Sequence, residues 1–408
     1  MKKILLLFVA IGLCLQAYAY DWVPKSNAEL YGEMIEFAYA FADSAAGTKA
    51  ETILRKFIAR QERTFGQDPY AWIPATYKCV CKLEALYPPV LDDGSENATM
   101  RRNILRLCDF PLHVHDRPDP KHPDIAGWKP PVEQKEAYDD FKRGGYMEDS
   151  FDAAAKWLRR PAPQTGELAL FKVYNMGFLL RTDKHCIAFD IGRSPTPALV
   201  AAILDKVDVL FMSHRDRDHH NLALIEKMVK AGKTVVLSQD ILKDIDLPAK
   251  NVIWENVIEE PLDFDGIQVR ILAGVQGKRG APSSLPNNLY HVTMDGWVVT
   301  HTGDNSDKKL ETQFSNMPLP DVAIFNCWTR FKYYMDALKN CQDYNPSNII
   351  CVSSHENEVI HGVMGRESWW EMFTRMDRCG DPDYEYPPII FMNLKEELRL
   401  KKIILRQI

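Results

Sequence analysis

Residues 209–221, VLFMSHRDRDHHN, constrain this chain more than any other stretch. Four apolar residues, Val209 to Met212, are followed by three histidines and two aspartates within seven positions. The apolar run is typical of a buried strand, and binding groups collect in the loops that follow such strands. A solvated turn gives no reason for so dense a group of imidazoles and carboxylates. We therefore predict that residues 213–220, the signature loop, bind a metal ion.

The chain divides into segments of different periodicity. From residue 20 to about 160, apolar residues recur at three- and four-residue spacing, which predicts helices and a proline-rich connector. From Glu167 onward, short alternating and apolar runs predict strands with interleaved helices, typical of an α/β domain. We predict a signal peptide over 1–19, a helical N-terminal region over 20–165 and an α/β domain over 166–408.

The N-terminus has the pattern of a secretory signal peptide. Lys2 and Lys3 precede an apolar run from Ile4 to about Leu15, and Ala17-Tyr18-Ala19 follows. The run is shorter than the roughly 20 residues that a membrane-spanning helix needs. We expect cleavage after Ala19, export to the periplasm or the medium, and no integral membrane segment in the mature chain.

Composition narrows the expected partners. The 408 residues carry a formal net charge of −6, which argues against nucleic acid because phosphate binding needs a basic face. The glycine-rich signatures of nucleotide-binding loops and the G-x-S-x-G elbow of serine hydrolases are missing from the sequence. We expect a small-molecule substrate, and the sequence does not indicate an oligomeric state.

The signature loop has a family resemblance. His214, Asp216, Asp218 and His219 form H-x-D-x-D-H, which resembles the H-x-H-x-D-H motif of the metallo-β-lactamase superfamily. The resemblance covers roughly residues 167–408: GFLLRTDKHCIAFDIG is similar to the opening strands of that family, and GWVVTHTGDN and NIICVSSHENE are similar to later strands that deliver ligands. It implies an αβ/βα sandwich with metals at one edge, preceded here by the helical region.

The resemblance also implies a ligand set of two metal positions. One position would use His214, Asp216 and a bridging aspartate, Asp304. The other would use four ligands, which are Asp218, His219, Asp304 and His355. The histidine that the family usually adds to the first position is missing from ILAGVQGKRGAPSSLPNN, where Gln276 is the nearest polar residue. A neutral amide is a poor zinc ligand. We expect one firmly bound ion at the second position, most plausibly Zn²⁺, with Mn²⁺ or iron also suitable, and a weaker second ion.

The implied mechanism is metal-assisted hydrolysis. Asp218 would hold the attacking water and accept its proton. We expect His301 to orient a ligand by a hydrogen bond and His361 to act as a proton donor. Asp190, which ends IAFDIG, is expected to brace the signature loop, and His220 to precede a helix.

Three functions are compatible with these features. The first is an exported metallo-hydrolase that acts on an ester, lactone, amide or phosphodiester. The second is a non-catalytic binding module with a degraded metal centre, and the third is an iron-dependent redox protein on the same fold. The fold does not decide among them. Metal content separates the first two, and metal identity separates the third.

Overall fold

The computed structural model describes ten parts of the chain. They are residues 27–67, 71–112, 148–242, 252–253, 258–277, 284–306, 314–326, 331–354, 373 and 389–402. The predicted signal peptide, the proline-rich connector, His355 and His361 lie outside these residues. In the described part of the chain, no helix is both long enough and apolar enough to cross a membrane.

Two seven-stranded sheets form the larger part of the molecule. In spatial order, the first sheet contains β14 (Glu397–Lys401), β1 (Glu167–Tyr174), β2 (Gly177–Arg181), β3 (Cys186–Phe189), β4 (Val209–Met212), β5 (Thr234–Leu237) and β6 (Val252–Ile253). The second contains β13 (Ile389–Met392), β12 (Ile350–Ser354), β11 (Val322–Phe325), β10 (Trp297–His301), β9 (Leu285–Met294), β8 (Ile267–Gln276) and β7 (Ile258–Phe264). Strands β3 to β6 are parallel, as are β10 to β13, and antiparallel pairs complete both sheets.

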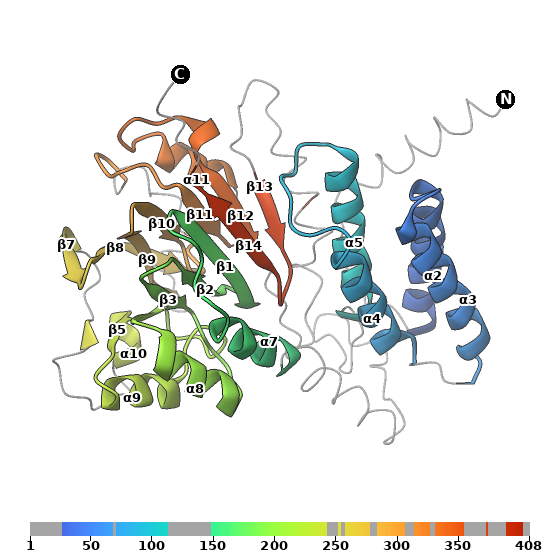
Figure 1. Ribbon diagram of the computed structural model, residues 1–408, viewed down its shortest axis with the longest axis horizontal. Coiled ribbons are helices and arrows are strands. Elements are labelled where there is room, and N and C mark those ends of the chain that lie inside the picture. Colours follow the sequence, from blue (N-terminus) through green and yellow to red (C-terminus); the bar gives the residue numbers. More distant parts are fainter. Residues whose placement is uncertain are drawn as a thin grey trace.

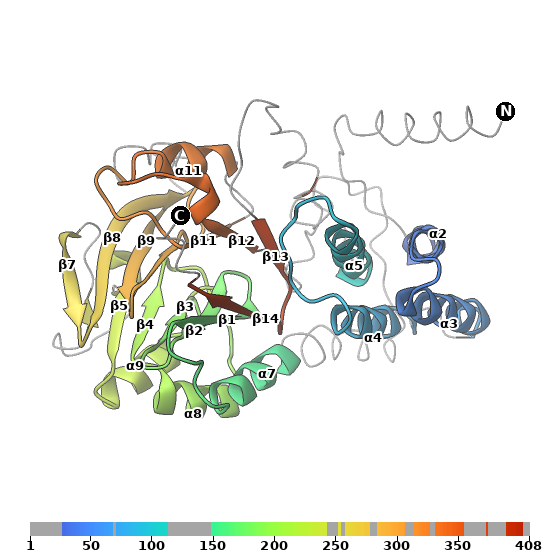
Figure 2. The same ribbon diagram turned by 45° about the horizontal axis from the view of Figure 1, so that its top comes forward.

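The inner faces of the two sheets share one apolar core. Phe178 and Phe211 from the first sheet pack with Val292 and Val299 from the second, and all four are fully buried. Helices cover the outer faces. Figure 2 shows α8 and α9 beneath the first sheet and α11 above the second. The described helices of this part of the chain are α7 (Asp149–Leu158), α8 (Pro197–Lys206), α9 (Leu222–Lys230), α10 (Gln239–Leu242), α11 (Phe331–Leu338) and the short 3₁₀ helix η3 (Pro346–Asn348). The predicted αβ/βα sandwich is confirmed.

In the described residues, four helices precede the sandwich before residue 113, as the periodicity predicted. They are α2 (Asn27–Ser44), α3 (Lys49–Thr64), α4 (Trp72–Glu84) and α5 (Glu96–Leu112). Thr48 caps α3 by accepting a hydrogen bond from the amide of Glu51. Helix α5 stands beside β13, and α2 and α3 lie farther from the sandwich (Figure 1). Helix α7 lies before the predicted boundary at residue 166 but packs against β1 and α8, so it extends the layer over the first sheet.

A buried ionic cluster joins the helices to the sandwich, and we call it the junction cluster. Its members are Arg101 of α5, Glu84 at the end of α4 and Glu396 in the β13–β14 turn. Arg101 forms an ion pair with Glu396 and also donates to the carbonyl of Phe391 at 3.4 Å. Glu84 accepts a hydrogen bond of 2.7 Å from Asn393. Only 2% of the Arg101 side chain is exposed, so this charge cluster is part of the interior.

Candidate metal centre

The signature loop begins where β4 ends and leads into α9. Asn221 caps α9 by accepting a hydrogen bond of 2.9 Å from the amide of Leu224, and His220 precedes this cap as predicted. The amide of His219 donates to the carbonyl of Asp216 at 2.9 Å, which closes a turn inside the loop. The loop is therefore held at both ends, and the side chains of His214 and His219 are fully buried.

His214, His219 and Asp304 meet at the centre of the site. Their candidate ligand atoms all lie within 4.8 Å of one another, and all three residues are buried. The Nε2 atoms of His214 and His219 lie 3.7 Å and 3.3 Å from Oδ2 of Asp304. The Nδ1 atoms are used elsewhere: that of His214 lies 3.0 Å from Oγ of Ser213, and that of His219 lies 2.9 Å from Oδ2 of Asp190. Both rings thus direct Nε2 toward Asp304, as metal-binding histidines do.

Two further carboxylates divide the cluster into two donor groups. Oδ2 of Asp216 lies 3.5 Å from Nε2 of His214, and Oδ2 of Asp218 lies 3.3 Å from Nε2 of His219. The first donor group is therefore His214, Asp216 and Asp304, and the second is His219, Asp218 and Asp304. They differ in access to solvent, because 44% of the Asp216 side chain is exposed and only 8% of Asp218.

The electrostatics of the cluster favour a bound cation. Burial alone would raise the pKa of Asp218, but the imidazoles of His219 and His214 hold it well below its ordinary value. Burial alone would lower the pKa of His219, but the carboxylates of Asp304 and Asp218 raise it well above its ordinary value. The site therefore keeps Asp218 ionised and stabilises positive charge at His219. A metal ion would supply this positive charge in place of the proton on His219. Its ligands, including both side chains, must then be deprotonated.

Two candidate ligand atoms of the cluster lack hydrogen-bond partners among the described residues. Nε2 of His214 and Oδ1 of Asp304 are buried and have no hydrogen-bond partner among the described residues. A buried polar atom is normally paired, because leaving it without a partner costs free energy. Together with the imidazole and carboxylate chemistry of the set, these two atoms indicate that the residues present fit a metal ion.

Asp190 braces the signature loop, as the sequence predicted. One carboxylate oxygen accepts the amide of Ser213 at 2.7 Å, and the other accepts both the hydroxyl of Ser213 at 2.7 Å and Nδ1 of His219 at 2.9 Å. Asp190 itself has a positive φ of 47°. Nearby, a Cβ atom on Gly192 would lie 2.0 Å from the carbonyl oxygen of Asp218, so only glycine permits this close approach of the loop.

Asp304 is positioned by the tight turn that follows β10. Gly303 has a φ of 52°, and a Cβ atom there would lie 2.5 Å from side-chain atoms of Ser213 and Asn287. Oδ1 of Asn287 accepts the amide of Asp304 at 2.9 Å. Asn287 was not predicted, because a polar residue within a strand carries no spacing signal that connects it with an aspartate on another strand.

His301 contacts backbone atoms and not the donor groups. Its Nε2 lies 2.8 Å from the carbonyl oxygen of Met176, and its Nδ1 accepts the amide of Gly303 at 3.2 Å. The ring stacks on Phe189 with centroids 4.5 Å apart and an interplanar angle of 2°. The expected hydrogen bond to a ligand side chain is thus replaced by bonds to backbone. These contacts give His301 a positioning role at the turn before Asp304.

Two carboxamides also reach the cluster. Nδ2 of Asn175, in the β1–β2 turn, donates to Oδ2 of Asp218 at 2.9 Å. Nε2 of Gln276, at the end of β8, lies 2.8 Å from Oδ2 of Asp216 and 3.1 Å from Oδ2 of Asp304. Sequence spacing identified Gln276 only as the nearest polar residue, and it missed Asn175. The remaining predicted ligand, His355, and the predicted proton donor, His361, lie outside the described residues, so their roles stay predictions.

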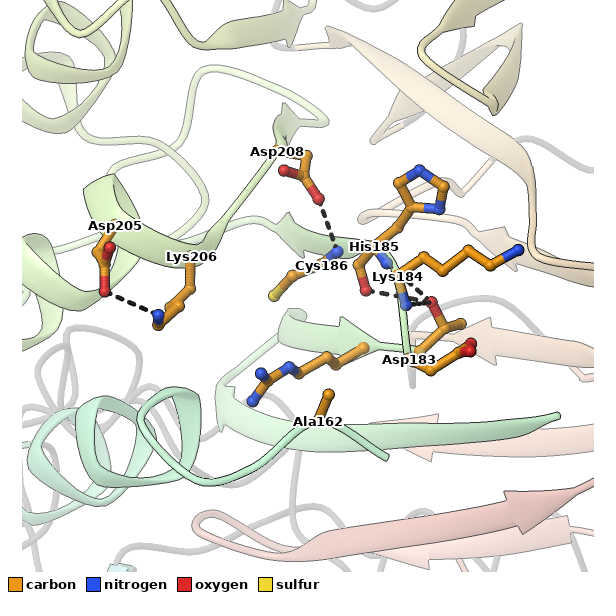
Figure 3. A pocket seen from close by; sticks show the side chains of 10 residues that line it. Ala162, Asp183, Lys184, His185, Cys186, Asp205, Lys206 and Asp208 are labelled. Atoms are coloured by element: carbon orange, nitrogen blue, oxygen red, sulfur yellow. Dashed lines mark hydrogen bonds and ion pairs between the residues drawn. The ribbon is translucent and has the colours of Figure 1, made fainter. Parts of the chain in front are cut away.

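A surface pocket lies at the opposite end of β3 and is separate from this centre. Its lining residues are Ala162, Arg181, Thr182, Asp183, Lys184, His185, Cys186, Asp205, Lys206 and Asp208 (Figure 3). Its charges are mixed and partly paired: Lys206 lies 3.1 Å from Asp205, and Asp208 accepts the amide of Cys186 at 2.9 Å. Since Cys186 begins β3 and Asp190 follows its other end, the pocket is remote from the metal centre.

A protein-family model matches the part of the chain that contains the candidate metal centre. Residues 173–353 match the model of the beta-lactamase superfamily domain. The match spans the signature loop, Asp190 and Asp304. Residues 173–353 are therefore similar to a beta-lactamase superfamily domain, and they include the buried His/His/Asp candidate metal site. No curated protein matches the chain.

Solved structures with a similar fold are remote in sequence. Igni18, a metallo hydrolase from Ignicoccus hospitalis, is 17% identical with a TM-score of 0.41, and the match covers 58% of this chain and 99% of that one. YhfI, a metallo-β-lactamase fold protein from Bacillus subtilis, is 12% identical with a TM-score of 0.38, covering 57% and 99%. CmlA, a diiron β-hydroxylase from Streptomyces venezuelae, is 12% identical with a TM-score of 0.36, covering 64% and 62%. At these TM-scores, the likenesses add nothing to what the family match shows.

Proposed function

We propose that this protein is a metal-dependent hydrolase whose metal centre is built on the signature loop and Asp304. The observation that carries the proposal is the convergence of His214, His219 and Asp304, whose candidate ligand atoms lie within 4.8 Å of one another in the interior. His219, Asp218 and Asp304 would hold the ion, joined by His355 as the sequence predicted. A bound Zn²⁺, Mn²⁺ or iron ion would lower the pKa of water and polarise the bond to be cleaved.

The residues of the chain have separate tasks in this proposal. Asp218 accepts the proton of the attacking water, for which its carboxylate must be ionised, and the neighbouring imidazoles favour that form. Asn175 holds one oxygen of Asp218 at 2.9 Å, which limits rotation of the carboxylate. Asp190 fixes Nδ1 of His219, so that Nε2 stays directed at the ligand position.

The proposed substrate is a small molecule that contains an ester, lactone, amide or phosphodiester bond. The core residues act on the water and on the scissile bond, so they do not select among these classes. The proposed site of action is outside the cytoplasm, since the N-terminus has the pattern of a signal peptide.

The test is elemental analysis of the purified mature protein, followed by hydrolysis assays with the four substrate classes. We expect about one metal ion per chain, and hydrolysis of at least one class that a chelator abolishes and Zn²⁺ or Mn²⁺ restores. Asp304→Ala should lose both the metal and the activity. His185→Ala is the matched control, because His185 is paired with Asp295 at the opposite end of β3, where its Nδ1 lies 2.8 Å from Oδ2.

Two results would redirect the proposal. A protein that binds none of zinc, manganese or iron after reconstitution would be a binding module. A coloured protein that holds iron and consumes oxygen without hydrolysing any of the four classes would be a redox protein.

A further inference from the structure

The two donor groups share Asp304 but differ in their surroundings. In each group, one imidazole Nε2 faces one carboxylate of the signature loop and Oδ2 of Asp304, at distances between 3.3 and 3.7 Å. By distance alone, the two groups offer similar sites. The difference lies in the carboxamides: Asn175 contacts Asp218 in the second group, and Gln276 contacts both carboxylates of the first.

Gln276 spans the first donor group. Its Nε2 lies 2.8 Å from Asp216 and 3.1 Å from Asp304, so one amide nitrogen faces the two oxygens that a metal ion would need to bring together. An ionised carboxylate only accepts hydrogen bonds, whereas a carboxamide NH₂ donates two. The amide group therefore satisfies both oxygens without any ion. It brings no negative charge and is a poor ligand for zinc.

Solvent access strengthens the difference between the groups. The side chain of Asp216 is 44% exposed, so water solvates its charge and weakens its attraction for a cation. The side chain of Asp218 is 8% exposed, and the second group is thus largely shielded from water. A cation is attracted more strongly to ionised groups in such a shielded site.

We propose that Gln276 makes this a one-metal centre, because its carboxamide occupies the first donor group and leaves His219, Asp218 and Asp304 as the single tight metal position. This inference rests on the proposed function and names the residue that sets the metal stoichiometry of its site. Gln276 acts here as a residue that determines metal number and does not itself bind the ion.

The experiment measures metal stoichiometry and not activity alone. Metal-free protein is titrated with Co²⁺, followed by visible absorption, and with Mn²⁺, followed by electron paramagnetic resonance; bound metal is also counted by elemental analysis. The wild type should bind one equivalent tightly. Gln276→His, which adds an imidazole, should bind a second Co²⁺ at least about 10- to 100-fold more tightly than the wild type does. Gln276→Glu, which keeps the shape and adds a carboxylate, should do the same with Mn²⁺.

Gln276→Met is the matched control. It keeps the length of the side chain, so the first donor group stays filled, and it offers neither a hydrogen-bond donor nor an oxygen ligand. Tight binding should therefore remain at one equivalent. Thermal unfolding of each metal-free variant checks that the fold is retained.

Three results would overturn the inference, and they differ from a failure of the proposed function. If the wild type binds two ions tightly and Gln276→Met binds one, the Gln276 oxygen is a metal ligand. If Gln276→His and Gln276→Glu, both folded, still bind one equivalent, Gln276 does not set the stoichiometry. If all four proteins bind two ions, the first donor group is a tight site regardless of Gln276. A wild type that binds no metal would instead remove the proposed function, and the inference with it.

Discussion

The metal centre and the junction cluster both bury carboxylates, but they treat the charge in opposite ways. At the junction, burial dominates: it raises the pKa of Glu84, and it raises that of Glu396 to about 8, since one guanidinium faces two carboxylates. At the metal centre, the imidazoles of His219 and His214 outweigh burial and keep the pKa of Asp218 low. A carboxylate that stays ionised can bind a metal, whereas one that takes up a proton cannot. The junction cluster is therefore suited to hold the N-terminal helices to the sandwich, and the metal centre is suited to bind an ion.

The largest expected effect comes from removing the shared charge of the metal centre. Asp304→Asn keeps the shape of the side chain but removes its charge. Losing a residue that only hydrogen-bonds to a metal ligand costs up to about 100-fold in activity. Since Asp304 is itself a proposed ligand, we expect at least about a 100-fold loss of hydrolysis. In the wild type, Zn²⁺ should raise the melting temperature, because it binds only the folded state. In Asp304→Asn this rise should vanish while the metal-free fold persists. A Zn²⁺-dependent rise of equal size in both proteins would contradict the comparison.

The junction cluster should affect stability and leave metal binding unchanged. Arg101→Met leaves Glu84 and Glu396 without their guanidinium, which should lower the free energy of unfolding by about 3–5 kcal/mol. Urea unfolding measures this loss. Adding Glu396→Gln to Arg101→Met should recover part of it, since one of the two carboxyl groups left without a guanidinium is then replaced by an amide. Lost metal binding in folded Arg101→Met would show that the two clusters are not independent.

The third prediction concerns the brace of the signature loop. Asp190→Asn cannot accept from His219 and Ser213 as the carboxylate does, so metal affinity should fall about 10- to 100-fold. Competition with a chromophoric chelator measures the affinity. Asp295→Asn is the matched control, because Asp295 also pairs with a histidine, His185, but at the other end of β3. Equal losses in both variants would contradict a specific role for Asp190.

The smallest expected effect is a pH dependence of stability at the junction. Glu396 has a pKa of about 8 in the folded protein, above the roughly 4.3 of an unfolded chain. The stabilisation that comes from the protonated Glu396 carboxyl group is therefore fully present below the pKa of the unfolded chain. It is lost as the pH rises through about 8. Between pH 6 and 8, the free energy of unfolding should fall by roughly 2 kcal/mol. Glu396→Gln should flatten this slope, and an unchanged slope in that variant would assign the titration to another group.

Much of the site could be predicted from the sequence because local order carries the information. An apolar run that ends in H-x-D-x-D-H placed His214, Asp218 and His219 in one loop after β4, and that loop is observed. The change from helical to strand periodicity near Glu167 separated the N-terminal helices from the sandwich. Asp304 was predicted through the resemblance of GWVVTHTGDN to a ligand-bearing strand of the metallo-β-lactamase superfamily. In each case, residues close in sequence determine the outcome.

Only the tertiary structure decided which side chains close the site and which turn away. Gln276 meets Asp216 across 60 positions, and Arg101 meets Glu396 across 295. His301 was expected to support a ligand but contacts Met176, 125 positions away. Sequence spacing places a residue on a strand and near its end. It does not show which buried donor or acceptor on another strand will face that residue, because the packing of the two sheets decides this.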